Sequence, residues 1–577
     1  MVQCLHCARL LSVLFFLEIL CSSTVSATAP ASRVTRFTPA TNDELATAVA
    51  EAYGEEDASL RQAAQTKYGA INTWDTSKIT DMSRLFIGLD LDGADLSAWA
   101  TGNVITMRQM FKDASGLNTS LAAWDVSKVK DMSDMFHKVP SVPEIKSWDV
   151  SEVMDMSGMF HGVSSVPDIK QWDVSKVTSM AKMFKLSTAS PSYSGLGSWV
   201  TSSAKDMSEM FENSVNVAVD IANWDVSKVV NMERMFKGAR LEVGGPKLGP
   251  KVWDVSSVTN MAELFHSTAT LDKQTQESIG KWTLVKVEDM AGMFAYQDSN
   301  FNPDLSKWNV ATVADMSRMF DDAIAFNGDI RSWDTSKVVD MHKMFSGTTF
   351  NQDIGSWDVS KVEDMSYMFR SALFDQDIGR WRTSSVKNMK GMFQEAHFDQ
   401  NIRAWDTSRV TEMTAMFEST IRFNQNIGEW TTSSVEDMSY MFREALVFDQ
   451  DIGSWDTSRV TDMSFMFSEA IKFNQDISSW NVDKVRKMDG MLCDADAFLQ
   501  DLSRWPQKPD CYKIPPPGWQ PKPKGGSWII PLLLVILICG GVVGTVAWLK
   551  NAQQQQTSAP PAAGARTDGL ELRASRA

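Results

Sequence analysis

The sequence predicts an α/β solenoid of about 17 repeats of about 25 residues, each forming a strand, a turn and a helix, followed by one C-terminal transmembrane helix. Three observations predict this architecture. A Trp returns every 24 or 25 residues over most of the chain. Nearly all of the 34 Met and 18 of the 21 Trp fall at fixed places in this period. An uncharged run of 22 residues lies near the C-terminus. A fixed period in this range is the signature of repeat architectures.

Two segments precede the repeats. Residues 1–27 read as a secretory signal peptide, with a basic start, an apolar stretch and a small-residue cleavage site. An uncleaved anchor is the alternative, because Glu18 interrupts the apolar stretch. Residues 28–70 form a polar linker and a helical cap, in which Leu45 and Val49 follow one another at helical spacing. A solenoid needs such a cap because its first coil is otherwise open.

The repeat Trp residues and their neighbours form the predicted core. In most repeats an aliphatic residue lies three positions before the Trp, a Val five after it, and Met residues eight and eleven after it, with a Phe directly after the second Met. Pro250, before Trp253, is the only break at the aliphatic position. This regularity favours a packed core over copper, haem or sugar sites. In residues 448–467 the core positions are Ile452, Trp455, Val460, Met463, Met466 and Phe467. The same pattern surrounds Trp74, Trp99, Trp124, Trp148, Trp172, Trp199, Trp224, Trp253, Trp282, Trp308, Trp333, Trp357, Trp381, Trp405, Trp430, Trp480 and, incompletely, Trp505.

Residues 71–505 form the repeat solenoid, and each repeat carries two periodicities. The sequence FDQDI at 448–452 alternates apolar and polar residues, which predicts a short strand. After the Trp, the apolar residues of 460–467 fall on one face of a helix that begins at Ser458. Stacking would place the strands in one parallel sheet and the helices on the opposite face. An all-β coil with an extended Val–Met segment is the competing prediction. Residues 185–198 and 237–252 are expected to loop out of the stack.

Three segments follow the repeats. Residues 506–527 are a Pro-rich stalk, 528–549 are long and apolar enough for a transmembrane helix, and 550–577 form a short disordered cytoplasmic tail. Together with the signal peptide, the span predicts a single-pass type I protein of the plasma membrane with an extracellular repeat domain.

Charge and motifs exclude several classes of function. The net charge is −16 and the sequence pI is near 5.0, which disfavours nucleic acid as a partner because no basic groove is offered to phosphates. No nucleophile elbow or phosphate-binding glycine loop occurs, and the one CxxC pair, Cys4 and Cys7, lies in the predicted signal peptide, so no catalytic residue and no cofactor are predicted.

The repeat, with a DxxxVxxMxxMF half and an FNQDIxxW half, resembles the BspA-type leucine-rich-repeat surface proteins, whose repeat is also that of mycoplasma surface lipoproteins. The entry segment KYGAINTWDTSKITDMSRLF at 67–86 resembles theirs as well. The resemblance covers roughly 41–505, and the transmembrane anchor is typical of a eukaryotic member. It implies a leucine-rich-repeat-like solenoid used in adhesion or recognition, and it supplies no catalytic residues.

One row of acids is the best candidate for ligand binding. Asp353, Asp377, Asp451 and Asp476 repeat at one place in the predicted strand, each preceded by a Gln. Equivalent residues of stacked coils lie about 4.8 Å apart. A row of carboxylates that faces outward could bind Ca²⁺ or a cationic partner. The alternative is a solvated edge that deters aggregation.

Three smaller features carry predictions. Cys493 and Cys511 lie where the repeats end and are expected to pair in an oxidising compartment, with two free thiols as the alternative. Asn118 begins the only glycosylation sequon. His137 and His161 lie on adjacent coils; two ligands are too few for a metal, so solvent-facing side chains are expected.

These features predict a non-enzymatic cell-surface protein that binds an extracellular protein or glycan through the face of its solenoid. The alternative is a structural coat or spacer protein that binds copies of itself.

Overall fold

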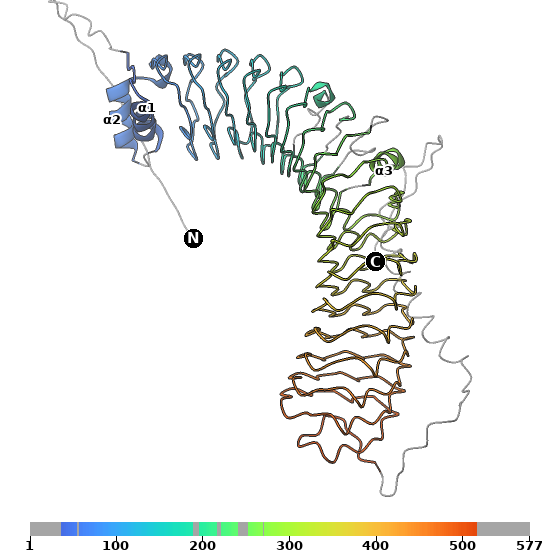
Figure 1. Cartoon of the computed structure of the whole chain (residues 1–577). Coiled ribbons are helices and arrows are strands. Elements are labelled where there is room, and N and C mark those ends of the chain that lie inside the picture. Colours follow the sequence, from blue (N-terminus) through green and yellow to red (C-terminus); the bar gives the residue numbers. More distant parts are fainter. Residues whose placement is uncertain are drawn as a thin grey trace, which may run out of the picture. The chain divides into compact units, whose positions relative to one another are not determined.

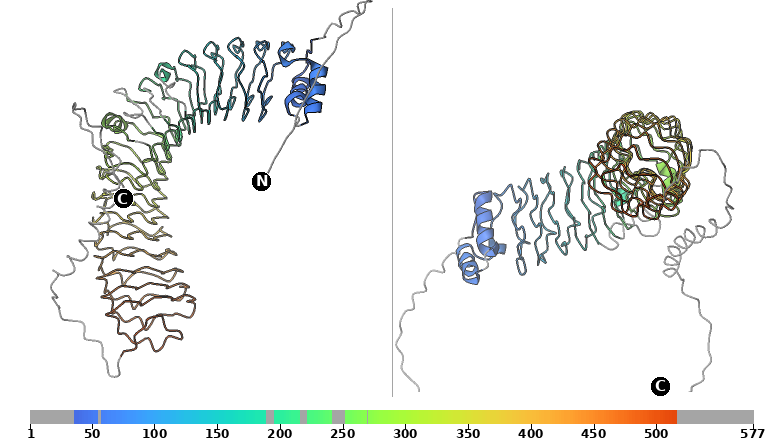
Figure 2. Two further views of the ribbon diagram at one scale, coloured as in Figure 1. Left: turned by 180° about the vertical axis from the view of Figure 1, so that it is seen from behind. Right: turned by 90° about the horizontal axis from the view of Figure 1, so that it is seen from below.

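Successive repeats stack as coils of one solenoid. The computed structural model describes residues 36–54, 57–188, 195–215, 221–240, 252–268 and 270–515. The coils lie side by side in chain order and belong to one compact unit, Met1–Pro515 (Figures 1 and 2). The predicted repeat solenoid is therefore confirmed.

The predicted signal peptide at 1–27, the membrane span at 528–549 and the tail at 550–577 lie outside the described residues. Among the residues that are described, no helix is long and apolar enough to cross a membrane. Residues 189–194 of the predicted loop at 185–198, and residues 241–251 of the predicted loop at 237–252, also lie outside the described part.

Helices are few, and most of them cap or interrupt the stack. In chain order they are α1 (Asn42–Val49), the π-helical turn η1 (Ala50–Gly54), α2 (Ala58–Tyr68), the 3-10 turns η2 (Ile71–Thr73) and η3 (Leu196–Ser198), and α3 (Lys273–Ile279).

The helices α1 and α2 cover the first coil (Figure 1). Thr41 begins α1, because its hydroxyl accepts a hydrogen bond from the Glu44 N–H at 3.2 Å. Leu45 and Val49 are buried. The Phe37 ring lies 5.2 Å from that of Trp74, the first Trp of the stack. The cap therefore shields apolar surface that an inner coil would bury against its neighbour.

The segment after each Trp is a chain of tight turns, and the predicted helix is wrong. No α-helix lies in 460–467 or in the matching segment of any other described coil. Phe465 has a φ of 57° and Glu469 a φ of 61°, and residues at these two places have φ between 53° and 69° in all seventeen coils. A left-handed residue at every fourth position cannot belong to a right-handed α-helix.

These turns direct backbone N–H groups toward the next coil. Met463 and Phe465 donate to the carbonyls of Lys487 and Asp489 at 2.9 and 2.8 Å, and the next two alternate residues of the segment do the same. Met466 closes a turn onto the Met463 carbonyl at 3.2 Å. Single-residue parallel bridges join each coil to the next at the start of this ladder. The competing prediction of an extended Val–Met segment is wrong as well, because the segment is made of turns and only single-residue bridges join the coils there.

The predicted strand at 448–452 is also wrong, because no strand is found among the described residues. Side chains join the coils on this side. The Asp449 N–H donates to Asn424 Oδ1 at 3.0 Å, and the Asn474 N–H donates to Asp449 Oδ1 at 2.9 Å. Gln475 Nε2 donates to the same Asp449 oxygen at 2.7 Å. We call this array the side-chain ladder.

The spacing of the coils explains why side chains replace a sheet here. The ring centroids of Phe448 and Phe473 lie 6.1 Å apart, whereas those of Phe442 and Phe467, beside the turns, lie 5.6 Å apart. Paired strands lie about 4.8 Å apart. The coils are wider apart on this side, and an Asn or Asp side chain supplies the additional reach.

The predicted core positions lie inside the solenoid. Trp455 stacks between Trp430 and Trp480 at 6.5 and 6.2 Å, and its Nε1–H donates to the Ile427 carbonyl of the preceding coil at 3.2 Å. The repeated Trp therefore fills the core and satisfies its one polar atom at the same time. Side chains with at most 3% exposure are Ile452, Trp455, Val460, Met463, Met466 and Phe467.

Candidate functional site

An exposed row of carboxylates lies on the wide side of the coils. Asp353, Asp377, Asp451 and Asp476 are all exposed, and one oxygen of each accepts the N–H of the residue two positions later at 2.9–3.2 Å. The Gln residues before them, such as Gln475, are half-buried and bond to the preceding coil. The Asp side chains therefore face solvent in a fixed orientation, and we call them the Asp row.

The structure does not test whether the Asp row binds calcium. Within the described part of the chain, no group of three or more His, Cys, Asp or Glu side chains is arranged to hold a metal ion. Calcium requires six to eight oxygen ligands. A Ca²⁺ site at this row therefore stays a prediction.

The Asp row extends into two further coils, whose Asp residues are not among the four predicted from the sequence. Asp304 and Asp329 stand four residues before Trp308 and Trp333, as the Asp-row residues do before their own Trp. The Arg331 guanidinium bonds both oxygens of Asp329 at 2.9 and 2.8 Å and lowers the pKa of that carboxyl to about 2. The fixed spacing of four residues before the repeat Trp identifies Asp304 and Asp329 as members of the row.

Two hollows open along this row. The first, the Arg403 hollow, has a volume of about 460 Å³. Its floor is shallow at Gly379, where an added Cβ would lie 2.4 Å from the Asn401 carbonyl oxygen. Only Gly permits so close an approach of two coils while leaving the space above them empty. The lining residues are Asp377, Gly379, Arg380, Gln400, Asn401, Arg403, Ala404 and Glu429.

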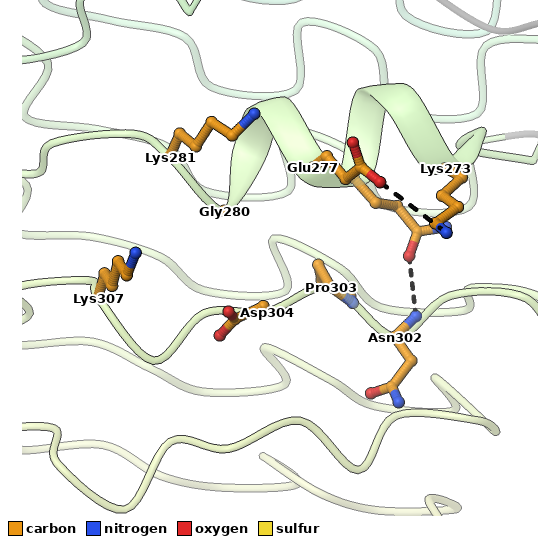
Figure 3. A pocket seen from close by; sticks show the side chains of 9 residues that line it. Lys273, Glu277, Gly280, Lys281, Asn302, Pro303, Asp304 and Lys307 are labelled. Atoms are coloured by element: carbon orange, nitrogen blue, oxygen red, sulfur yellow. Dashed lines mark hydrogen bonds and ion pairs between the residues drawn. The ribbon is translucent and has the colours of Figure 1, made fainter.

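The second, the Lys281 hollow, lies where α3 packs against the next coil, and its volume is about 370 Å³ (Figure 3). The helix takes the place of the Phe-Asn-Gln segment of later coils, and Asp272 caps it by accepting the Thr275 N–H at 2.7 Å. The lining residues are Lys273, Gln276, Glu277, Gly280, Lys281, Asn302, Pro303, Asp304 and Lys307.

Buried Gln276 fixes α3 onto its neighbours. Its Nε2 donates to the carbonyls of Leu271 and Asn300 at 2.8 and 3.1 Å, and its Oε1 accepts the Asn302 N–H at 3.0 Å. Gly280 completes the floor, because an added Cβ would meet the Asp304 carbonyl oxygen at 2.4 Å. The hollow is thus built on rigid backbone.

The two neighbouring histidines are half-buried, and the prediction that they face solvent is wrong. The rings of His137 and His161 lie 4.3 Å apart, and Asp134 Oδ1 is 3.5 Å from His137 Nδ1. Burial, and next the neighbouring His137, lower the pKa of His161 to about 4. Their rings are held by packing between coils, since two adjacent repeats both place a His there.

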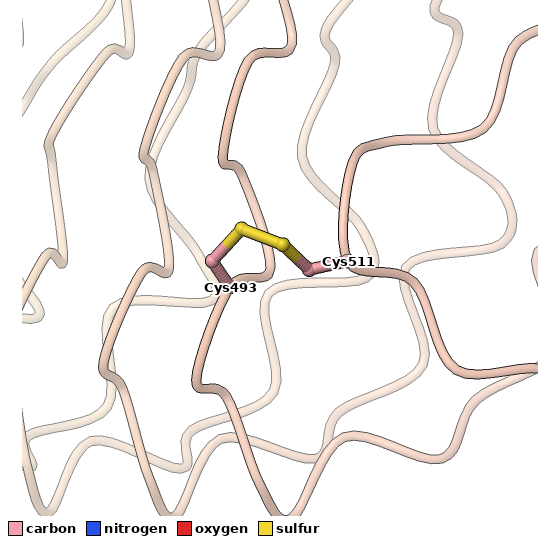
Figure 4. The surroundings of a disulfide bond; sticks show 2 residues. All are labelled: Cys493 and Cys511. Atoms are coloured by element: carbon pink, nitrogen blue, oxygen red, sulfur yellow. A yellow bond between two sulfur atoms is a disulfide. The ribbon is translucent and has the colours of Figure 1, made fainter.

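Cys493 and Cys511 form a disulfide that joins the last coil to the residues after it (Figure 4). The Tyr512 hydroxyl accepts the Leu502 N–H and donates to the Gln500 carbonyl, both at 3.1 Å. The segment 506–514 is therefore tied to the last coil at two points.

The predicted glycosylation acceptor is accessible. Asn118 is exposed, and its Nδ2 donates to Asp92 Oδ1 at 3.2 Å. The structure does not test whether a glycan is attached there.

Comparisons with known proteins give a family but no function. The family described as "Mycoplasma protein of unknown function, DUF285" matches residues 57–167, 140–243, 163–275, 246–349, 269–373, 327–425 and 396–505. No functionally curated protein matches the chain.

Among solved structures, the chain is similar to the leucine-rich-repeat ectodomain of the plant membrane receptor kinase GASSHO1/SCHENGEN3 from Arabidopsis thaliana, in complex with CASPARIAN STRIP INTEGRITY FACTOR 2. The identity is 8% and the TM-score 0.18, over 69% of this chain and 61% of that one. So weak a likeness bears on neither fold nor function. The family matches, by contrast, overlap and together span 57–505. The chain therefore belongs to the DUF285 repeat family.

Proposed function

We propose that this chain is a non-enzymatic cell-surface protein that adheres to, or recognises, an extracellular protein or glycan through the solenoid face that carries the Asp row. The observation that carries the proposal is the row itself. The same exposed carboxylate is held in the same orientation in several coils, such as those of Asp353, Asp377 and Asp476. A partner with a repeating or extended surface would meet equivalent groups at regular intervals.

Rigidity supports this mechanism. The side-chain ladder beneath the row fixes each coil to the next, as in the bond from the Asn474 N–H to Asp449. A pre-ordered surface loses little conformational entropy on binding. Several weak contacts made at once then add to a useful affinity.

The surface location rests on the predicted signal peptide and membrane span, and the disulfide agrees with it. Disulfides persist in oxidising compartments, and Cys493 is bonded to Cys511. The resemblance to BspA-type surface proteins points the same way.

Enzyme chemistry has less support. Neither the Lys281 hollow nor the Arg403 hollow contains a His or Cys. In the irregular coils, Glu263 Oε2 lies 2.7 Å from Lys237 Nζ and also contacts Arg234. This carboxylate serves an ion-pair network.

The test is binding of the purified full-length chain to arrays of glycans and surface proteins, with and without Ca²⁺. A hit should be weakened when Asp353, Asp377, Asp451 and Asp476 are all changed to Asn. The matched control changes four exposed Asp residues on another row, each with the same turn geometry: Asp334, Asp358, Asp406 and Asp456. Equal weakening by both sets would contradict recognition through the Asp row.

One observation favours the alternative of a self-associating coat or spacer. In each inner coil, four alternate backbone N–H groups donate hydrogen bonds to the next coil. In the last coil the equivalent N–H groups have no acceptor among the described residues; they belong to Met488, Gly490, Leu492 and Asp494. Open edges of this kind promote pairing with another chain. Concentration-dependent self-association without any ligand, measured by light scattering, would favour this alternative.

A further inference from the structure

We propose that the Lys281 hollow is a subsite for an anionic saccharide, which binds there through a carboxylate or sulfate group. The inference rests on the proposed function, because the hollow lies on the Asp-row face. It names the class of ligand that this part of the face selects.

The charges in the hollow favour an anion. Lys273 Nζ lies 4.0 Å from Glu277 Oε1, so the carboxylate offsets the positive charge of this lysine. Asp304 accepts hydrogen bonds from the Ser306 N–H at 3.0 Å and the Ser306 hydroxyl at 2.6 Å. The Ser306 hydrogen bonds, and more weakly the charge of Lys307, lower the pKa of Asp304. The side chains of Lys281 and Lys307, by contrast, form no salt bridge and donate no hydrogen bond within the described part of the chain. Two exposed ammonium groups therefore face one hollow in a chain whose net charge is −16.

Figure 3 shows how these groups are arranged. Lys281 and Lys307 come from neighbouring coils and stand at the same end of the hollow, with Asp304 between them and the rest of the lining. An anionic group placed between the two ammonium groups would be bound by both, while the Asp304 carboxylate can accept hydrogen bonds from hydroxyls of the same sugar.

The size and floor suit a small unit of a polymer. A volume of about 370 Å³ lies in the range of about 300–1,000 Å³ typical of small-molecule sites. Gln276, with three hydrogen bonds, and the close contact at Gly280 keep the floor in place. Binding would therefore require little rearrangement of the protein.

The lining disfavours a protein partner and a neutral sugar. Protein interfaces depend on buried aromatic or large apolar anchors, and the lining holds neither an aromatic side chain nor a large aliphatic one. Neutral sugars are commonly bound by stacking on aromatic rings, but the Trp residues of these coils are buried, as with Trp282 and Trp308. Charge and hydrogen bonds remain as the means of recognition.

Continuity along the row extends the argument from one sugar unit to a chain. The Arg403 hollow lies three coils beyond Asp304, and it offers Arg380 beside Asp377. On this side the Phe rings of successive coils lie 6.3, 6.0 and 6.2 Å apart, which gives a span of roughly 18 Å. An extended saccharide lying along the row can reach both hollows.

The experiment compares three hexasaccharide probes on the full-length chain: a heparin fragment for sulfate, an oligogalacturonate for carboxylate, and maltohexaose as the neutral control. We expect one anionic probe to bind, and its affinity to fall as salt rises. The double variant Lys281→Gln/Lys307→Gln should weaken that binding about fivefold or more. The matched control Lys337→Gln/Lys361→Gln, which removes two exposed lysines from another row, should leave it nearly unchanged.

Three results would overturn the subsite: no binding of either anionic probe, equal binding of maltohexaose, or equal weakening by the two double variants. Failure of the subsite is distinguishable from failure of the proposed function. An array ligand that is lost on neutralising the Asp row, yet binds normally to Lys281→Gln/Lys307→Gln, would preserve recognition by this face and overturn the saccharide site alone.

Discussion

Left-handed residues recur at two places in every coil, ten and fourteen positions after the repeat Trp. Many of them are not Gly, as with Phe465 and Glu469. A left-handed conformation costs an ordinary residue about 1–2 kcal/mol. The coil-to-coil hydrogen bonds of alternate residues offset that cost, because these bonds form only when the turns hold the N–H groups along the stack.

Gly391 tests this conformation at one residue. Its φ is 55°, and an added Cβ would lie 2.4 Å from the Tyr367 ring. We expect Gly391→Ala to destabilise the protein by about 1–3 kcal/mol through strain and crowding. In an α-helix the same change would stabilise by about 1 kcal/mol. The shift of the urea midpoint distinguishes the two.

The companion variant Gly391→Ala/Tyr367→Ser should recover part of the loss, because the ring contact is gone while the left-handed strain stays. A higher midpoint for Gly391→Ala alone would contradict the turn.

His161 provides a pH-dependent test. Burial, and then the neighbouring His137 and Lys185 side chains, hold the pKa of His161 at about 4, whereas an unfolded His titrates near 6.5. The unfolded chain therefore binds more protons between these values, and stability falls as pH drops from about 6.5 toward 4. We expect the melting temperature of the His161→Gln variant to depend less on pH over this window than that of the unchanged protein. Titration of the His161 ring at pH 6.5 or above, followed by NMR, would refute this.

The elements of this fold are coils joined by different means on two sides. Backbone bonds join the turns, while the side-chain ladder joins the wide side, where Asp449 serves two donors of the next coil. This division explains why both Asn and Asp occur at that place in different coils, since each offers an acceptor oxygen.

Asp449 tests the ladder. Asp449→Ala leaves the Asn474 N–H and Gln475 Nε2 without their acceptor, and we expect a loss of about 1–3 kcal/mol. Asp449→Asn keeps the acceptor and should be nearly neutral. Asp451→Ala, at an exposed position of the same coil, should cost less than Asp449→Ala. Chemical denaturation measures all three, and equal losses for Asp449→Ala and Asp451→Ala would contradict the ladder.

The extent of successful prediction also differs by element. The Trp and Met spacing gave the solenoid and its core, because burial of Trp455 and Met463 depends only on the repeat. The same spacing could not distinguish a helix from the turns, since both bury Val460, Met463 and Phe467 on one side. The apolar–polar alternation at 448–452 likewise did not distinguish which of the Asp and Gln rows faces solvent, nor the means by which the coils are joined.

The candidate site was predictable only in part. Asp353 and its equivalents were found because they recur in Phe-Asn-Gln repeats. The Lys281 hollow was not, because α3 departs from the repeat pattern, and lysines such as Lys281 and Lys307 carry no local signal. Their proximity arises from stacking, which joins residues one coil apart.

At the scale of the whole molecule, the stack turns single side chains into rows. Each exposed contact is worth only about 0.2–1 kcal/mol, so one Asp offers little, whereas four on a rigid face act together. The helical cap covers the first coil, and the disulfide ties residues 506–514 to the last one, whose outward N–H groups, such as those of Met488 and Gly490, still lack an acceptor among the described residues. The Asp row lies on the side of the solenoid and not at its ends, so that side is the surface offered to a partner.

The most direct test of recognition by a repeated row is to neutralise it stepwise. Affinity for the array ligand would be measured for chains with one, two, three and all four of Asp353, Asp377, Asp451 and Asp476 changed to Asn. The account predicts a graded loss, about 1.5- to 5-fold for each residue. Full loss from any single change, or unchanged affinity after all four, would contradict it.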